Sequence, residues 1–369
     1  MNFNRLRQLP FRNFSRTIEM IRGNTTTNQN LNDISLRGIK LNSNYNDNPN
    51  MIFFVDYFDK PENWLTFFMQ NKTLDYRNVY ILNNPNFGNS DYSHANDMEA
   101  IDPEATVSAV ERFMWQNKIS TATLAGHGFG ARTAMLFGCF RSEMVTGVAA
   151  IDYTPTDYTK FDVVWRLNTA LNQLDQISKD MLSGKMTRNQ VNKYIEDNVP
   201  HPKMQALFKQ NVKFLGNDSF AWDFNMDLVK NHLSLMVNWR PSNGLYPGRA
   251  NFLFPEYSDY VFLGTHTNAM RKIAVTLGDY FQDIQCEITN NDEPYSNHFV
   301  YENQDLATSF ALKLNRFLHM YDGVHTLLKS RGEVYERTFI PHRIHELKEE
   351  LRTDAFPNHY HHNWKYQKA

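Results

Sequence analysis

Short apolar runs alternate with amphipathic stretches in the first half of the chain. The runs at 51–55, 78–82, 121–125 and 145–151 are mostly apolar and carry no charged residue, which is typical of buried strands. Pro103–Asn117 instead has its apolar side chains at helical spacing, which predicts an amphipathic helix. Strands that alternate with helices predict a parallel sheet covered by helices on both faces.

The pattern changes after residue 154. Long amphipathic stretches follow with no strand expected between them, and they predict a helical cap inserted into the sheet: Val163–Leu182, Arg188–Asn198, Lys203–Leu215 and Asp227–Trp239. Strand character returns at 251–254 and 284–288, and Asp305–Tyr321 has the apolar spacing of a core helix. The fold class that this order of elements predicts is α/β.

These changes divide the chain into five segments. We expect a targeting-like segment with an extension at 1–48, the first part of the core at 49–153, the cap at 154–248, the second part of the core at 249–329 and an interaction tail at 330–369. Within the extension, Ile34, Leu36, Ile39 and Leu41 alternate with other residues, which favours an edge hairpin just before the core.

Composition narrows the class of protein. The chain has 369 residues, of which 41% are hydrophobic and 14% aromatic, enough for a large core. Its net charge of −2 argues against general nucleic-acid binding. Cys139 and Cys286 lie far apart in apolar patterns, so we expect two buried free thiols, without a disulfide or a metal between them. No apolar run is long enough to cross a membrane.

The first 22 residues are rich in arginine and contain a single acid, Glu19. Apolar side chains are interleaved with these arginines, which is typical of a mitochondrial targeting segment. The alternative is a basic arm that binds a partner protein, and both roles can hold at once. The aromatic residues of the two terminal extensions favour contacts with other protein subunits.

The motif with the most chemical content is Gly126-His127-Gly128-Phe129-Gly130. It lies between an expected strand and an expected helix, which is the context of the nucleophile elbow G-x-S-x-G. The central position of that motif carries the nucleophile in active enzymes, and here it is Gly128. Glycine has no side chain that can attack a carbonyl carbon. The sequence therefore keeps the elbow and lacks its nucleophile.

The chain resembles the α/β-hydrolase superfamily. Within it, the resemblance is strongest to the group that contains the mitochondrial α/β-hydrolase domain-containing protein 11 and bacterial esterases. It extends over roughly residues 51–318 and rests on four motifs in order. The segment from Gly126 is similar to the group's GHSMGGKTAM and the segment from Ala150 to its VDISP; Phe220–Asp227 is similar to FVWRVNLD, and Asn297-His298 to the start of its GHWIH motif.

This resemblance implies a triad at Gly128, His298 and an acid, which is Asp152, Asp227 or Asp259. The nucleophile is missing from that triad. The group's HGLFG loop, which supplies an oxyanion-hole N–H, corresponds here to Val55–Asp59, where negative charge would oppose an oxyanion. Substitute nucleophiles would have to come from neighbours outside the elbow, namely Ser90, Ser93, Thr133 or Tyr57. We expect no working catalytic residue, no cofactor and no metal.

The C-terminal histidines raise the question of a zinc site. His359, His361 and His362 lie in a segment without regular periodicity and without cysteine, so a surface tail is the simpler interpretation. His342 and His345 have helical spacing, but no third ligand is evident. We interpret both groups as solvent-facing.

Together these patterns predict a catalytically inactive protein, not an enzyme, with an α/β-hydrolase fold, an inserted helical cap and terminal extensions. We expect it to be mitochondrial, peripheral to the inner membrane, and a structural accessory subunit of a respiratory-chain complex. The mitochondrial ribosome is the second choice of assembly. Two alternatives remain: an unconventional esterase or thioesterase, and an acyl- or lipid-binding module that uses the old pocket. No direct contact with nucleic acid is expected.

Overall fold

The computed structural model describes residues 18–21, 34–42, 49–70, 77–93, 101–183, 186–199, 201–216, 219–239, 246, 248, 250–255, 258–261, 281–284 and 298–330. Within these residues the central sheet has eight strands in the order β1-β2-β4-β3-β5-β6-β9-β10. They are β1 (Ile18–Ile21), β2 (Gly38–Leu41), β3 (Asn50–Phe54), β4 (Asn78–Leu82), β5 (Ala122–His127), β6 (Val145–Ile151), β9 (Ala250–Pro255) and β10 (Phe281–Ile284).

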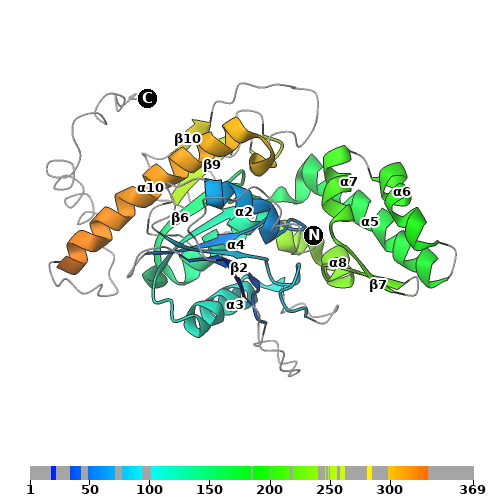
Figure 1. The fold of residues 1–369 in the computed structure, drawn as a ribbon, viewed down its shortest axis with the longest axis horizontal. Helices are drawn as coiled ribbons and strands as arrows, with labels where there is room; N and C mark the ends of the chain where they lie inside the picture. The colour runs from blue at the N-terminus through cyan, green and yellow to red at the C-terminus, as the bar shows by residue number, and fades with distance from the viewer. Residues whose placement is uncertain are drawn as a thin grey trace.

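The sheet is mostly parallel, as the alternation of elements predicted. From β4 to β10 all neighbouring strands pair in parallel, and among the described strands of this sheet the β1–β2 and β2–β4 pairs are antiparallel. Helices cover both faces of this sheet (Figure 1). They are α2 (Pro61–Gln70), α3 (Pro103–Gln116), α4 (Phe129–Phe140) and α10 (Gln304–Ser330). The predicted α/β fold class is therefore confirmed.

Strand β3 shows why the core strands are apolar throughout. Ile52 and Phe54 point into the cluster that contains α3 and α4, whereas Met51 and Phe53 point into the cluster that contains α2 and α10. Because successive side chains of a strand face opposite sides, a strand covered on both faces needs an uninterrupted apolar run. All four side chains are fully buried.

The region between β6 and β9 lies at one end of the molecule (Figure 1). It contains α5 (Asp162–Leu182), α6 (Arg188–Asn198), α7 (Pro202–Lys209) and α8 (Met226–Val237). The expected helix Lys203–Leu215 is too long, because α7 ends at Lys209 and the chain enters an antiparallel pair, β7 (Val212–Gly216) with β8 (Ser219–Trp222). Val212, Lys213 and Phe214 alternate with the period of a strand, which sets that boundary.

The early hairpin is present, with one unexpected partner. Strand β2 pairs with β1, and β1 lies inside the segment interpreted as an Arg-rich leader. Residues 1–17 of that segment lie outside the described residues, as do Cys286, the C-terminal histidines and residues 331–369. Cys139 is a half-buried free thiol on α4. Among the described residues, no helix is both long and apolar enough to cross a membrane.

Candidate active site

The elbow is formed as the motif predicted. Gly128 follows β5 and precedes α4, with φ of +51°, a left-handed conformation that favours glycine. Its N–H donates to the carbonyl oxygen of Ile151 at 2.9 Å. Gly130 permits the close approach of α4 to the sheet, because a Cβ there would lie 2.3 Å from the Phe54 carbonyl oxygen. The backbone of a nucleophile elbow is thus intact.

The carboxyl group of Asp56 occupies the place where a nucleophile on the elbow would lie. A Cβ built on Gly128 would fall 2.4 Å from the Asp56 Cγ and 2.5 Å from each carboxyl oxygen. Real Cβ atoms do not approach that closely, so a side chain at residue 128 and the observed Asp56 exclude each other. The elbow has no side chain of its own, but the space above it holds a carboxylate from the loop after β3.

Two backbone N–H groups hold the Asp56 carboxylate. Its Oδ1 accepts from the N–H of Phe129 at 2.6 Å and from the N–H of Tyr57 at 2.8 Å. The first donor belongs to the residue after the elbow position, the N–H that serves an oxyanion hole in this motif. From the sequence, an acidic residue in this loop was expected to oppose the charge of an oxyanion. The structure shows that the Asp56 oxygen itself is bound there.

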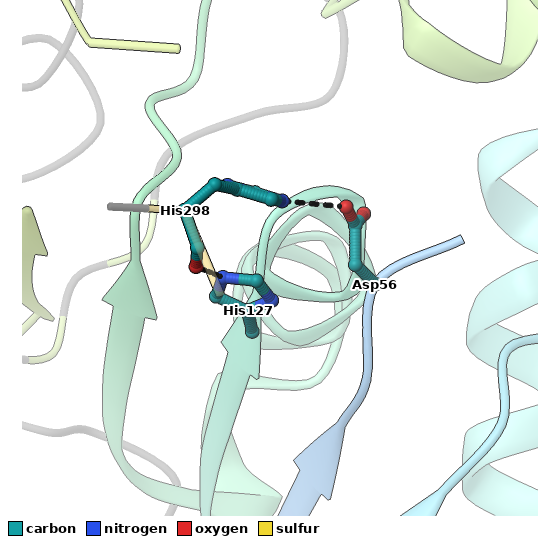
Figure 2. A group of neighbouring side chains, drawn as sticks. All are labelled: Asp56, His127 and His298. Carbon is teal, nitrogen blue, oxygen red and sulfur yellow. Dashed lines mark hydrogen bonds and ion pairs between the residues drawn. The ribbon is translucent and has the colours of Figure 1, made fainter. Parts of the chain in front are cut away.

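His298 lies between two carboxylates (Figure 2 shows the contact with Asp56). Its Nδ1 is 2.7 Å from Asp152 Oδ2, and its Nε2 is 3.0 Å from Asp56 Oδ2. Burial lowers the histidine pKa, but the hydrogen bonds and negative charges of Asp152 and Asp56 outweigh it and raise the pKa of His298 to about 10. Both ring nitrogens therefore donate, and the imidazole is charged at neutral pH.

The acid that faces His298 Nδ1 is Asp152, at the carboxyl end of β6. Asp152 is fully buried with φ of +53°, and it accepts a short hydrogen bond from Ser258 Oγ. Of the other two acids considered, Asp227 is exposed on α8 and Asp259 is half-buried beside Ser258. The orientation of the histidine is fixed further by Tyr260, whose ring stacks on it at 4.2 Å.

The four residues considered as substitute nucleophiles make hydrogen bonds to groups other than His298. Ser90 Oγ accepts from the Arg37 N–H and donates to Asn83 O, and Thr133 Oγ1 donates to Asn84. The Tyr57 hydroxyl is directed to Met236 O, and the Ser93 N–H donates to Asn86. The side-chain partners of His298 are Asp152 and Asp56. The residue that sequence reasoning treated only as an obstacle, Asp56, is the one that reaches the histidine.

A pocket opens beside this constellation. Its interior has a volume of about 20 Å³, which is room for about one water molecule. Counted together with the open solvent at its mouth, the space free of protein atoms is about 370 Å³. Asp56 and His298 line it together with side chains that are mostly apolar, from the α4 start, the cap helices and the loop after His298: Phe129, Val163, Leu167, Met204, Leu207 and Phe299. The charged groups thus face an apolar cavity between the sheet and the cap.

No family model matches the chain. Curated relatives include the sn-1-specific diacylglycerol lipase ABHD11 of Mus musculus, 22% identical over 239 residues, which are 63% of this chain and 71% of the mouse protein. The same lipase of Xenopus tropicalis is 23% identical over 150 residues, 39% of this chain and 44% of the frog protein.

Solved structures give the same architecture. A marine microorganism esterase matches with a TM-score of 0.62 at 19% identity, covering 77% of this chain and 99% of the esterase. Potato epoxide hydrolase I matches with a TM-score of 0.53 at 14% identity, covering 84% of this chain and 100% of the epoxide hydrolase. The chain has the α/β-hydrolase fold. The resemblance drawn from the four sequence motifs is therefore confirmed at the level of this superfamily.

The expectation that this α/β-hydrolase-fold protein is not an enzyme is wrong. The proteins to which it is similar are a lipase, an esterase and an epoxide hydrolase, and they point to hydrolase activity. That expectation rested on the missing side chain at Gly128 and on the acids in the loop Val55–Asp59. A missing side chain on the elbow does not remove the chemistry if another segment places a reactive group in the same space.

Proposed function

We propose that the protein is a hydrolase of acyl thioesters or comparably activated esters, with Asp56 in the role of the missing serine. The observation that carries this proposal is the position of Asp56, whose Oδ2 is 3.0 Å from His298 Nε2 within the volume that a residue-128 side chain would occupy. The similarity to ABHD11, a lipase, supports hydrolysis of a carboxylic acid derivative.

In the first step, Asp56 Oδ2 attacks the acyl carbon and the bond to the leaving group breaks. His298 gives its Nε2 proton to the leaving group, and a mixed anhydride of Asp56 with the acyl chain results. A carboxylate is a weak nucleophile, so the leaving group must be good. Thiols have a pKa near 8.5, far below the range of alcohols, so thioesters suit this site better than alkyl esters.

In the second step, water attacks the Asp56 carbonyl carbon. Acylation has removed one of the two negative charges beside His298, so its imidazole can accept a proton from that water. The Nε2 of His298 is free to accept that proton because it gave its own proton to the leaving group in the first step. The N–H groups of Phe129 and Tyr57 already hold the Asp56 Oδ1, and they stabilise the negative charge that develops on this oxygen. The fatty or other acid leaves, and Asp56 returns to its carboxylate with the release of a proton.

The pocket determines which acyl groups are accepted. Val163 and Leu167 of α5 and Met204 and Leu207 of α7 line it opposite Asp56. These side chains offer apolar contacts, so burial of each methylene group of an acyl chain contributes about 0.8 kcal/mol. We therefore expect medium or long unbranched acyl chains to be better substrates than acetyl groups.

The test is hydrolysis of thioesters by the full chain, measured as thiol release. Octanoyl and acetyl thioesters are compared with the matching ethyl esters. The Asp56→Asn and His298→Asn variants should lose about 10³-fold or more in kcat/KM. Asp91→Asn serves as the control, because that carboxylate pairs with Arg37 away from the pocket. Full activity of Asp56→Asn, or faster hydrolysis of ethyl esters than of thioesters, would contradict the proposal.

We also propose a mitochondrial location, peripheral to the inner membrane, which the Arg-rich and acid-poor residues 1–22 support. Association with subunits of a larger complex through the terminal extensions remains a prediction from sequence. The location is tested by joining residues 1–48 to a fluorescent protein in cells. Import into mitochondria is the expected result, and diffuse fluorescence throughout the cell would contradict it.

A further inference from the structure

His127 is a buried histidine that the proposed hydrolysis does not use. It ends β5, one residue before the elbow, and is fully buried beneath Trp64 and His298, with ring centroids 5.0 and 4.3 Å away. Its Nε2 is 2.7 Å from the carbonyl oxygen of His298. A carbonyl oxygen only accepts hydrogen bonds, so Nε2 carries the hydrogen and Nδ1 carries a bare lone pair.

Among the residues that the structure describes, that lone pair has no hydrogen-bond partner. His127 Nδ1 is among the buried polar atoms left without one. A buried polar atom without a partner is costly, and it requires an explanation such as an ion that the atom binds.

Two further side chains that can bind a metal lie beside His127 (Figure 2). One ligand atom each from Asp56, His127 and His298 lies within 4.8 Å of the others, and all three residues are buried. Asp56 Oδ2 and His298 Nε2 are 3.0 Å apart. Ligands on a tetrahedral zinc ion are about 3.3 Å apart, given metal–ligand bonds of about 2.0–2.1 Å. Binding therefore requires the three ligand atoms to move together, from separations of up to 4.8 Å to about 3.3 Å.

Each histidine also has a hydrogen-bond acceptor at the ring nitrogen that would not bind the metal. A histidine that binds a metal through one nitrogen usually donates the other N–H to a carboxylate or a backbone carbonyl. His298 has Asp152 at its Nδ1, and His127 has the His298 carbonyl at its Nε2. These contacts fix the orientation of both histidine rings. They leave His298 Nε2 and His127 Nδ1 as the nitrogens that can bind a metal.

We propose that Asp56, His127 and His298 form a binding site for a divalent transition-metal ion such as Zn²⁺. Two imidazoles and one carboxylate are a zinc ligand set with one open position. The pocket that Asp56 and His298 line supplies the space for a water molecule at that position. The ion replaces the proton that Asp56 and His298 share.

The ion and the proposed hydrolysis exclude each other. A metal-bound Asp56 Oδ2 cannot attack an acyl carbon, and a metal-bound His298 Nε2 cannot transfer a proton. Bound zinc is therefore an inhibitor of thioester hydrolysis, a consequence that rests on the proposed function. The metal site itself does not rest on it, because binding is measured without substrate.

The experiment is equilibrium dialysis of the full chain against micromolar Zn²⁺ after treatment with a chelator, with bound zinc counted by mass spectrometry. We expect one ion per chain. His127→Phe keeps an aromatic ring against Trp64 and removes the lone pair, and it should abolish stoichiometric binding. Asp152→Asn should weaken affinity about 10–100-fold through the orientation of His298. His232→Ala, on α8, is the matched control and should bind as the wild type does.

A second measurement covers the case in which His127→Phe does not fold. Co²⁺ added to the wild-type chain should give the strong visible absorption of a tetrahedral ion, and Asp56→Asn, of nearly the same shape, should lose it. Absence of stoichiometric zinc from the wild-type chain would overturn the proposal. So would zinc binding or a cobalt spectrum that is unchanged in both His127→Phe and Asp56→Asn.

Discussion

Gly128 and Asp56 have to be considered together. Both were recognised in the sequence, one as a lost nucleophile and the other as an unfavourable charge in the oxyanion loop. The sequence could not show that the two changes compensate, because Asp56 and Phe129 are 73 positions apart and their contact depends on the path of the loop after β3. His127 was passed over for a similar reason, since its bare nitrogen is visible only once its hydrogen-bond partner is known.

Returning a serine to the elbow tests this exchange. In Gly128→Ser the new side chain meets the Asp56 carboxylate at 2.4 Å, so we expect a loss of about 1–3 kcal/mol in the free energy of unfolding and no gain in activity. In the double variant Gly128→Ser/Asp56→Gly the clash is relieved and a Ser–His298–Asp152 triad is rebuilt.

The readout is covalent labelling by a fluorophosphonate, which reacts with activated serines. The double variant should be labelled, and the wild type and Asp56→Gly alone should not. Equal stability of Gly128→Ser and the wild type in urea unfolding would contradict the steric argument. Comparable labelling of the two serine variants would contradict it as well.

Elements were predicted well wherever one period ran without interruption. Strand β6 and helix α6 have the bounds expected from sequence. Asp152 ends the apolar run of β6, and a capping box of Thr187 and Gln190 sets the start of α6. The β7–β8 pair was missed because its period-two segment is short and directly follows a helix. Strand β1 was missed because arginines on its N-terminal side dominate the composition of that segment.

The carboxylate of Asp175 links the cap helices α5 and α8, and its contribution to stability depends on pH. Asp175 of α5 is only 9% exposed, and it forms ion pairs with Lys179 of the same helix and with Lys230 of α8. Burial alone would raise its pKa, but the hydrogen bonds and charges of the two lysines lower it below 3.8. A lowered folded-state pKa gives stability that is present above pH 3.8 and is lost as the pH falls through the folded-state value.

Asp175→Asn should therefore destabilise the protein at pH 7, and the difference from the wild type should shrink as the pH is lowered below 3.8. The measurement is the urea concentration at half-unfolding, followed by circular dichroism at both pH values. Asp197→Asn, an exposed residue on α6, is the control and should leave the midpoint unchanged. A stability difference that persists unchanged at pH 3 would show that the charge of Asp175 is not its cause.

At the scale of the whole molecule, the fold could be predicted and the activity could not. The order of strands, the elbow and the histidine motif suffice to predict an α/β-hydrolase fold, because each depends on local pattern and on short connections. The activity depends on which charged groups meet above the elbow. These are Asp56 after β3, Asp152 after β6 and His298, and only the folded chain brings them within hydrogen-bonding distance.

The central claim is that Asp56 acts as the nucleophile, and isotopic labelling tests it most directly. A single turnover of an octanoyl thioester is run in ¹⁸O-water with enzyme in excess, and the peptide that contains Asp56 is weighed by mass spectrometry. Because the N–H groups of Phe129 and Tyr57 stabilise charge on the Asp56 oxygen, water should attack Asp56. We predict one ¹⁸O atom in Asp56 and none in the octanoate. Label in the octanoate with none in Asp56 would contradict the account.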